Sequence, residues 1–291
     1  MNQSTTLAVV GGDVRQAYLA ELLHEAGHTV RTFALERRPA AGCTAASDLQ
    51  ACLDDARAVI LPMPVQMGDG SLNAPLANAQ HTIGDVLDAI PAGTLTLAGA
   101  VPFSVHARAV QNGLTLIDYL SREELAIRNA VPTCEGALQL AMEQTAFTLQ
   151  NARCLVIGAG RIGMLLARKL YALDAQVTVS ARCTRDFARI AAAGLHALDT
   201  RSLAGHLAGF DLIFNTVPAP ILTTEVLSDM KPPCFIIDLA SLPGGVAADT
   251  LLPDGCRVLH ALSLPGKVAP LSAARAVFDT VDTILHEEGI L

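Results

Sequence analysis

The residues with the clearest chemical meaning form a glycine-rich segment, CLVIGAGRIG, from Cys154 to Gly163. An apolar run leads into three glycines at the G-x-G-x-x-G spacing of dinucleotide sites. Gly158 permits a tight turn, Gly160 lets the backbone approach a pyrophosphate, and Gly163 lets the next helix pack closely. The free amides at the start of that helix favour phosphate. We expect the whole turn to bind the cofactor: Gly158, Ala159, Gly160, Arg161, Ile162 and Gly163.

The segments around this turn suit a nucleotide-binding unit. Residues 154–157 predict a strand, 164–173 a helix and 176–180 a second strand, which together make a βαβ unit. A glycine turn that serves packing alone is the other interpretation. The flanking elements favour the nucleotide site.

The end of the second predicted strand indicates which nicotinamide cofactor binds. The chain reads Ser180-Ala181-Arg182 where an NAD site usually carries an acidic residue. The Ser180 hydroxyl and the Arg182 guanidinium, with help from Arg185, can hold a ribose 2′-phosphate. The sequence therefore favours NADP, with NAD possible, and a solvated loop arginine is the alternative for Arg182.

Two later segments also follow predicted strands. Ligands of open α/β sheets bind at the carboxyl ends of the strands. We therefore expect contacts with the ribose and nicotinamide from Asn215, Thr216, Val217, Pro218 and Ala240. Ordinary turn chemistry is an equally good explanation for any one of these residues.

A different kind of site is indicated near the start of the chain, in VVGGDVRQ (residues 9–16). This segment joins a strand to a helix without the three-glycine spacing, and Arg15 falls in the first helical turn. A helix N-terminus beside a guanidinium suits a small carboxylate, so this half is interpreted as the substrate domain. An ion-paired or surface Arg15 is equally compatible with the sequence.

The segment His24–His28 (HEAGH) matches the H-E-x-x-H string of zinc peptidases. That chemistry requires both histidines on one helical face. Gly27 is typical of a helix end, and His28 leads into a predicted strand. We therefore expect the histidines to lie on different elements, and no metal site.

The elements that position these residues alternate between strand and helix. Short β-rich runs fall at 7–11, 29–33, 58–61 and 95–98, and again at 154–157, 176–180, 211–214, 234–237 and 257–259. This alternation of strands and helices predicts an α/β protein of two doubly wound, Rossmann-like domains joined by an interdomain helix. The expected first domain is 1–132 plus a C-terminal helix at 270–291, the connecting helix 133–150, and the NAD(P)-binding domain 151–269.

Composition narrows the class of protein. The 291 residues are 51% hydrophobic and 16% charged, yet no apolar run approaches the roughly 18 residues of a membrane span. The start lacks the basic region of a signal peptide, so a soluble cytoplasmic chain is expected. A net charge of -8 argues against a nucleic-acid partner. Seven scattered cysteines without a C-x-x-C pair indicate reduced thiols.

Several segments in order along both halves resemble the A subunit of the bacterial dipicolinate synthases. They are GGDVRQ (11–16), REEL (122–125), NAVPT (129–133), EGA (135–137), the glycine turn, SAR (180–182), DLAS (238–241) and LPGKVAP (264–270). After Pro270 this chain has Leu-Ser-Ala-Ala where the family pattern is Lys-Thr-Ala-Gly. The resemblance implies an enzyme of sporulation, in the mother cell, that oxidises dihydrodipicolinate with a nicotinamide cofactor. It also implies a partner, the B subunit of dipicolinate synthase.

A ring dicarboxylate substrate, as the resemblance implies, needs cationic partners, and Arg15, Arg128 and Lys267 are candidates. His260, at a strand end, and Lys267, in the turn that follows, are the candidate catalytic groups. A structural histidine and a phosphate-binding lysine are the alternatives.

Two other functions remain open on the sequence. One is an NADP-dependent dehydrogenase of another small hydroxy or amino acid. The other is a non-catalytic NADP-sensing regulatory protein, since no Asp–His or Glu–His catalytic pair is evident in the sequence. A homo-oligomer is also possible.

Overall fold

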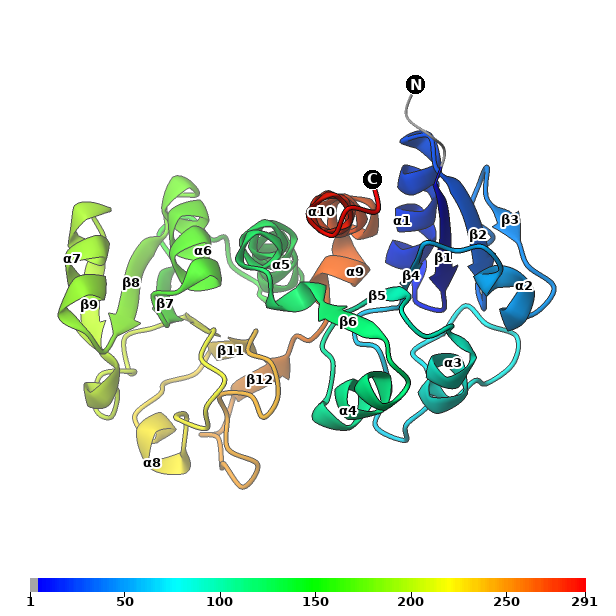
Figure 1. Cartoon of the computed structure of the whole chain (residues 1–291). Coiled ribbons are helices and arrows are strands. Elements are labelled where there is room, and N and C mark those ends of the chain that lie inside the picture. Colours follow the sequence, from blue (N-terminus) through cyan, green and yellow to red (C-terminus); the bar gives the residue numbers. More distant parts are fainter. Residues whose placement is uncertain (1–4) are drawn as a thin grey trace. The chain divides into compact units, whose positions relative to one another are not determined.

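The computed structural model describes residues 5–291, which divide into two compact units. One comprises the chain up to Asn129 together with Ala269–Leu291, and the other is Ala130–Val268. Each unit is built on a six-stranded sheet whose strands pair in parallel, with helices packed on it (Figure 1). The predicted fold class, two doubly wound α/β domains, is confirmed.

The first sheet has the strand order β3-β2-β1-β4-β5-β6. Its strands are β1 (Thr6–Val10), β2 (Thr29–Phe33), β3 (Thr44–Ala45), β4 (Ala58–Ile60), β5 (Leu95–Ala98) and β6 (Thr115–Asp118). The helices of this unit are α1 (Val14–Glu25), α2 (Leu49–Leu53), α3 (Ile83–Ala89), α4 (Phe103–Gln111), α10 (Pro270–Glu287) and the 3-10 turn η1 (Tyr119–Ser121).

Alternation along β1 explains why helices cover both faces of this sheet. Leu7 and Val9 join a core with α1 and α10, whereas Ala8 and Val10 join a core with α2, α3 and α4. All four side chains are fully buried, as a central parallel strand requires. Figure 1 shows α1 and α10 side by side on one face of the sheet.

The second sheet repeats this plan with the order β12-β11-β10-β7-β8-β9. Its strands are β7 (Arg153–Ile157), β8 (Gln176–Ala181), β9 (His196–Asp199), β10 (Leu212–Asn215), β11 (Cys234–Asp238) and β12 (Cys256–His260). The helices are α6 (Arg161–Ala172), α7 (Thr184–Ala192), α8 (Thr224–Leu227), α9 (Leu264–Val268) and the 3-10 turn η2 (Thr200–Ser202). Val156 of β7 packs toward α6, and its neighbours Leu155 and Ile157 pack on the opposite face.

Helix α5 (Glu123–Gln144) is longer than expected and displaced along the chain. The predicted helix over 133–150 is wrong at both ends. It begins too late because Pro132 lies inside the observed helix instead of before it, and the observed helix ends at Gln144. Proline removes one helical hydrogen bond, but burial outweighs that loss here. Leu125 is fully buried in the core of the first unit, and Ala137 and Ala141 are fully buried in that of the second.

The two histidines of the HEAGH segment lie on different elements, as predicted. His24 is in the last turn of α1, which ends at Glu25, and Gly27 turns the chain with φ 99° before His28 and β2. Within residues 5–291 no three His, Cys, Asp or Glu side chains are grouped as a metal site would require. No helix in that range is long and apolar enough to cross a membrane.

Candidate functional site

The glycine turn joins β7 to α6 in the conformation that its spacing predicts. Gly158 has φ 101°, and its amide donates to the Ser180 carbonyl at 3.0 Å. A β-carbon on Gly163 would lie 1.9 Å from the Gly158 carbonyl oxygen, so the helix approaches the turn as closely as backbone allows. Gly158 and Gly163 are therefore required by the shape of the turn itself.

Gly160 has a different role from the other two glycines. It is the N-cap of α6, carries no side-chain capping hydrogen bond, and has no atom within 4 Å of the position of a β-carbon. The start of the helix is therefore open at Gly160, a residue without a side chain. An uncapped helix N-terminus beside open space fits a pyrophosphate.

The end of β8 departs in part from the expected 2′-phosphate site. Ser180 is fully buried and its hydroxyl lies 3.0 Å from the Thr200 hydroxyl, which donates to it, so the prediction that it holds a phosphate is wrong. The side chain of strand residue Ser180 points into the protein. Arg182 follows the strand and is exposed. The guanidinium is therefore the group in this segment that remains suitable for a phosphate.

The neighbouring charges of α7 are already paired with each other. Arg185 and Arg189 lie 3.4 Å and 3.6 Å from Asp186. A hydrogen bond from the Cys183 thiol, at 2.9 Å, holds the pKa of Asp186 below its ordinary value. Arg185 is thus engaged by a carboxylate that stays ionised, which leaves Arg182 to act by itself.

The turn after β10 is shaped by its own side chains. Asn215 is fully buried; its amide nitrogen donates to the Val217 carbonyl at 3.0 Å, and its oxygen accepts from the Val217 amide at 3.1 Å. The Thr216 hydroxyl donates to the Ile157 carbonyl at 2.8 Å. The predicted ribose contacts of the Asn215 and Thr216 side chains are therefore replaced by structural bonds. Val217 and the exposed Pro218 remain candidates for the cofactor surface.

A buried carboxylate for which the sequence predicted no role lies at the end of β11. Asp238 is fully buried and accepts hydrogen bonds from the Asn215 side-chain amide (2.7 Å) and from the backbone amides of Ala240 (3.2 Å) and Gly245 (2.8 Å). His260 ends the adjacent strand, and its Nδ1 lies 3.4 Å from Asp238 Oδ2. Ala240, predicted as a cofactor residue, is buried and serves this carboxylate through its amide.

Lys267 lies in the short helix α9 rather than in an open turn. Its side chain is exposed, and no hydrogen bond or ion pair of its ammonium is found among residues 5–291. Ser263, just before this helix, has φ 60°, a conformation that non-glycine residues rarely adopt. Lys267 therefore offers an unpaired positive charge close to a strained connection.

The predicted carboxylate site at Arg15 is filled by the protein's own carboxylate. Asp13 caps α1 and binds the Arg15 guanidinium, with Nε and Nη2 donating at 3.0 Å and 2.8 Å. Arg15 Nη2 also donates to the Met63 carbonyl at 2.9 Å. The cavity at this point is about 10 Å³, about the space of a single water. Arg15 therefore has no room for a ring dicarboxylate here.

The surroundings of Arg15 are correspondingly rigid. The buried Tyr119 hydroxyl donates to the Leu61 carbonyl at 3.0 Å, and burial raises the pKa of this phenol. Arg128, the other predicted substrate residue, lies 3.6 Å from Asp279 of α10. Both predicted arginines are thus paired with carboxylates of their own unit.

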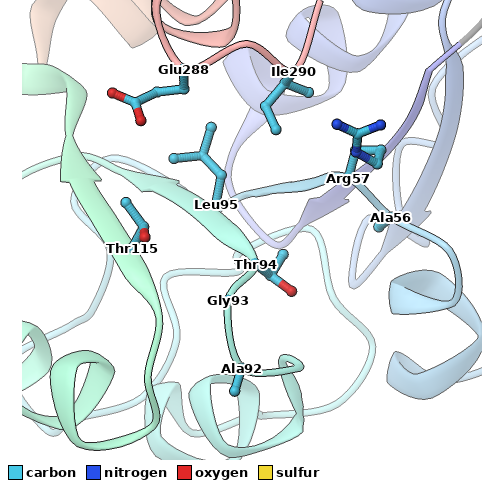
Figure 2. Close-up of a pocket in the computed structure, with 9 residues that line it drawn as sticks. All are labelled: Ala56, Arg57, Ala92, Gly93, Thr94, Leu95, Thr115, Glu288 and Ile290. Atoms are coloured by element: carbon cyan, nitrogen blue, oxygen red, sulfur yellow. The ribbon is translucent and has the colours of Figure 1, made fainter.

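Two larger cavities of the first unit lie in different places. One of about 410 Å³ is lined by Arg57, Thr94 and Thr115, with Glu288 and Ile290 near the end of the chain (Figure 2). Arg57 and Thr94 precede β4 and β5, and Thr115 begins β6, so this cavity is at the amino ends of the strands, opposite the edge where open α/β sheets bind ligands.

The other cavity, of about 330 Å³, is formed by Arg37 and residues from Met67 to His81. These segments follow β2 and β4 and therefore belong to the carboxyl side of the sheet. Arg37, Asn73, Asn78 and Gln80 are among the residues that line it. The Arg37 side chain donates to the Pro75 carbonyl at 3.4 Å, that of Asn73 to the Pro64 carbonyl at 2.9 Å, and that of Gln80 to Asp69 at 3.4 Å.

The geometry of the second unit defines its class. Its strand order is that of the dinucleotide-binding sheet, and its glycine turn joins the first strand to the first helix. It is an NAD(P)-binding domain of the Rossmann type, and residues 145–242 match a family model described as putative NAD(P)-binding.

The chain belongs to the family formed by the A subunit of dipicolinate synthase. Residues 6–120 match the family model for the N-terminal domain of that protein. The chain is 32% identical over 284 residues to the dipicolinate synthase A subunit of Bacillus subtilis (strain 168), covering 97% of this chain and 96% of that one. The family resemblance predicted from the motifs is confirmed.

Solved structures agree with this assignment. The crystal structure of the dipicolinate synthase A chain from Bacillus subtilis is similar with a TM-score of 0.89 at 31% identity, over 99% of this chain and 97% of that one. The corresponding protein from Bacillus halodurans gives a TM-score of 0.87 at 29% identity, over 97% of each chain.

Proposed function

We propose that this chain oxidises dihydrodipicolinate to dipicolinate with NADP. The observation that carries the proposal is the open, uncapped start of α6 at Gly160, in a chain whose match to the family runs nearly end to end. The exposed guanidinium of Arg182 supports NADP over NAD, because it lies where a ribose 2′-phosphate needs a cation.

The roles of the residues follow from their places. The glycine turn and the first amides of α6 hold the pyrophosphate, and Arg182 pairs with the 2′-phosphate. The nicotinamide, when bound, accepts a hydride. Val217 and Pro218 line the ribose side of the turn after β10, and Asn215 and Asp238 keep the strand ends in position by their mutual hydrogen bond at 2.7 Å.

The wider setting is proposed from the family. The B subunit of the synthase acts with this chain, and the reaction belongs to the cytoplasm of the mother cell in a sporulating bacterium.

The test is dipicolinate formation by the purified chain from freshly generated dihydrodipicolinate, with NADP or NAD, each with and without the B subunit. We expect product and reduced cofactor in equal amounts, with NADP preferred. Cofactor binding without product in every combination would refute the proposal and leave a regulatory function. Turnover only of hydroxy or amino acids would indicate another dehydrogenase.

The regulatory function was kept open because no acid–histidine pair is evident in the sequence. The 3.4 Å distance between Asp238 and His260 supports a catalytic function over a regulatory one. No feature of residues 5–291 favours a second function.

Replacing Lys267 with methionine should raise the KM for dihydrodipicolinate about tenfold, because a charge-assisted hydrogen bond to a substrate carboxylate is lost. Steady-state kinetics with saturating NADP measures this change. Lys231→Met, which removes another exposed lysine of the same unit, serves as the control. An unchanged KM in Lys267→Met would eliminate the lysine as a substrate ligand.

A further inference from the structure

The pair formed by Asp238 and His260 results from the register of two parallel strands. Asp238 is the last residue of β11, His260 is the last residue of β12, and the two are directly opposite in the ladder. Side chains opposite each other in register lie on the same face. This explains why residues 22 positions apart in sequence bring Nδ1 and Oδ2 to 3.4 Å.

The surroundings of Asp238 make it an acceptor at both oxygens. Oδ1 accepts from the Asn215 amide (2.7 Å) and the Ala240 backbone (3.2 Å), and Oδ2 accepts from the Gly245 backbone (2.8 Å). Each of these partners is an N–H donor. The carboxylate would attract a proton on the ring nitrogen that faces Oδ2, and it would repel a lone pair there.

This arrangement favours one tautomer of His260. In a neutral imidazole one nitrogen donates and the other accepts. A proton on Nδ1, facing Asp238, leaves Nε2 with its lone pair. Asp238 is fully buried, whereas 52% of the His260 side chain is exposed, so the acceptor nitrogen belongs to the accessible member of the pair.

The loop after β11 holds this pair in place. Gly244 has φ 86°, and a β-carbon there would lie 3.0 Å from Asp238 Oδ2 and 3.8 Å from His260 Nδ1. The backbone therefore covers Asp238 closely, and it does so in a conformation that favours glycine. Such packing restricts the carboxylate to the orientation that faces the imidazole.

The pair lies in the part of the sheet that is expected to bind the nicotinamide end of the cofactor. The glycine turn and Arg182 follow β7 and β8, on the half of a Rossmann sheet that binds the adenosine side. Asp238 and His260 end strands of the other half, β11 and β12. In such sheets that half receives the nicotinamide side of the dinucleotide.

We propose that Asp238 is a positioning residue that holds His260 with its proton on Nδ1, and that His260 Nε2 accepts the proton lost by the ring during oxidation. This inference rests on the proposed function. The dihydro ring loses two hydrogens: one leaves as a hydride with both electrons of its C–H bond, to NADP, and the other leaves as a proton to Nε2. The ring gains a double bond, and the imidazolium returns the proton to water.

The first test reads the tautomer and needs no turnover. Nitrogen-15 NMR of the holoprotein with NADP distinguishes a protonated from an unprotonated ring nitrogen, and loss of one signal set in His260→Gln assigns this histidine among the eight of the chain. We expect the proton on Nδ1 in the wild type. In Asp238→Asn the negative charge that attracts the Nδ1 proton is lost, so the share of this tautomer should fall. A proton on Nε2 in the wild type overturns the proposal.

The second test measures kcat with dihydrodipicolinate and NADP. His260→Gln should lower kcat by about 100-fold or more, the usual contribution of a positioned base. Asp238→Asn should lower kcat similarly, yet in the His260→Gln background it should change kcat by less than about threefold, since groups acting as a unit are not additive. His206→Gln, an exposed histidine elsewhere in the same unit, is the control.

The outcomes separate this inference from the function on which it rests. If the wild-type chain makes no dipicolinate, with or without the B subunit, both the proposed function and the proton transfer are contradicted. The NMR result still decides whether Asp238 holds the proton of His260 on Nδ1. If the losses of kcat in the two single variants multiply in the double variant, Asp238 acts independently of His260. Its role is then structural, and the positioning role is overturned. Normal kcat in His260→Gln, with NADP bound as in the wild type, would overturn the base.

Discussion

Gly163→Ala is expected to destabilise the second unit by about 3 kcal/mol or more, the cost of severe overpacking. Its β-carbon would lie 1.9 Å from the Gly158 carbonyl oxygen, and that atom is backbone. Gly158 cannot move away easily, because its amide bonds to Ser180 and the Thr216 hydroxyl is within 2.5 Å of the β-carbon position at Gly158. Thermal unfolding should show a loss of about 10 °C in Tm.

Gly160→Ala is the matched control, since it adds the same methyl group to the same turn. Gly160 has φ −83° and no atom within 4 Å of the added carbon, so Tm should be unchanged. The methyl group instead occupies the space assigned to pyrophosphate, and the Kd for NADP should rise about tenfold or more. Normal NADP affinity in Gly160→Ala would show that the phosphates bind elsewhere, and an unchanged Tm in Gly163→Ala would contradict the steric argument.

Strands with strong apolar runs were predictable from sequence, and three weakly buried edge strands were not. The strands β1, β7 and β11 are almost completely buried and read as continuous apolar runs. The strands β3, β6 and β9 were not predicted; they are sheet edges of two to four residues with exposed or half-buried side chains. Their conformation depends on the neighbouring strand, which no local pattern encodes.

The sequence itself contains evidence against the predicted role of Arg15 as a carboxylate ligand. Asp13 and Arg15 are two positions apart at the start of an element, and the same D-x-R spacing recurs at Asp199 and Arg201. In both places the aspartate accepts from the backbone amide and the guanidinium two residues on. The spacing therefore favours a local ion pair that caps the element. This pair occupies guanidinium N–H groups that a ligand would need.

The Asp238–His260 pair could not have been found in the same way. Both residues end predicted strands, but the sequence does not say which strands are neighbours or how their registers align. Only the observed pairing of β11 with β12 places the carboxylate beside the imidazole. Ser180 shows the converse: a residue in the expected position can point inward, because side chains alternate along a strand.

Arg182→Asp should lower the affinity for NADP about 100-fold and change that for NAD by less than about threefold, since charge-assisted hydrogen bonds contribute about 1.5–3 kcal/mol. The aspartate removes the cation at the 2′-phosphate and repels that group, whereas NAD presents a hydroxyl that a carboxylate can accept from. Fluorescence titration with NADPH and NADH measures both affinities. Arg182 has no ion pair within residues 5–291, so Tm should not fall.

Arg189→Asp makes the same change of charge on α7 and separates a local contact from a general field effect. Arg189 is paired with Asp186 at 3.6 Å and is not assigned to the cofactor. Because salt screens exposed charges that make no direct contact, this variant should keep most of the NADP preference. Equal losses of NADP and NAD affinity in Arg182→Asp would mean that the guanidinium supports the loop and not the phosphate. The preference for NADP would then depend on another residue, and the exposed hydroxyl of Thr184 at the start of α7 would be the next to replace.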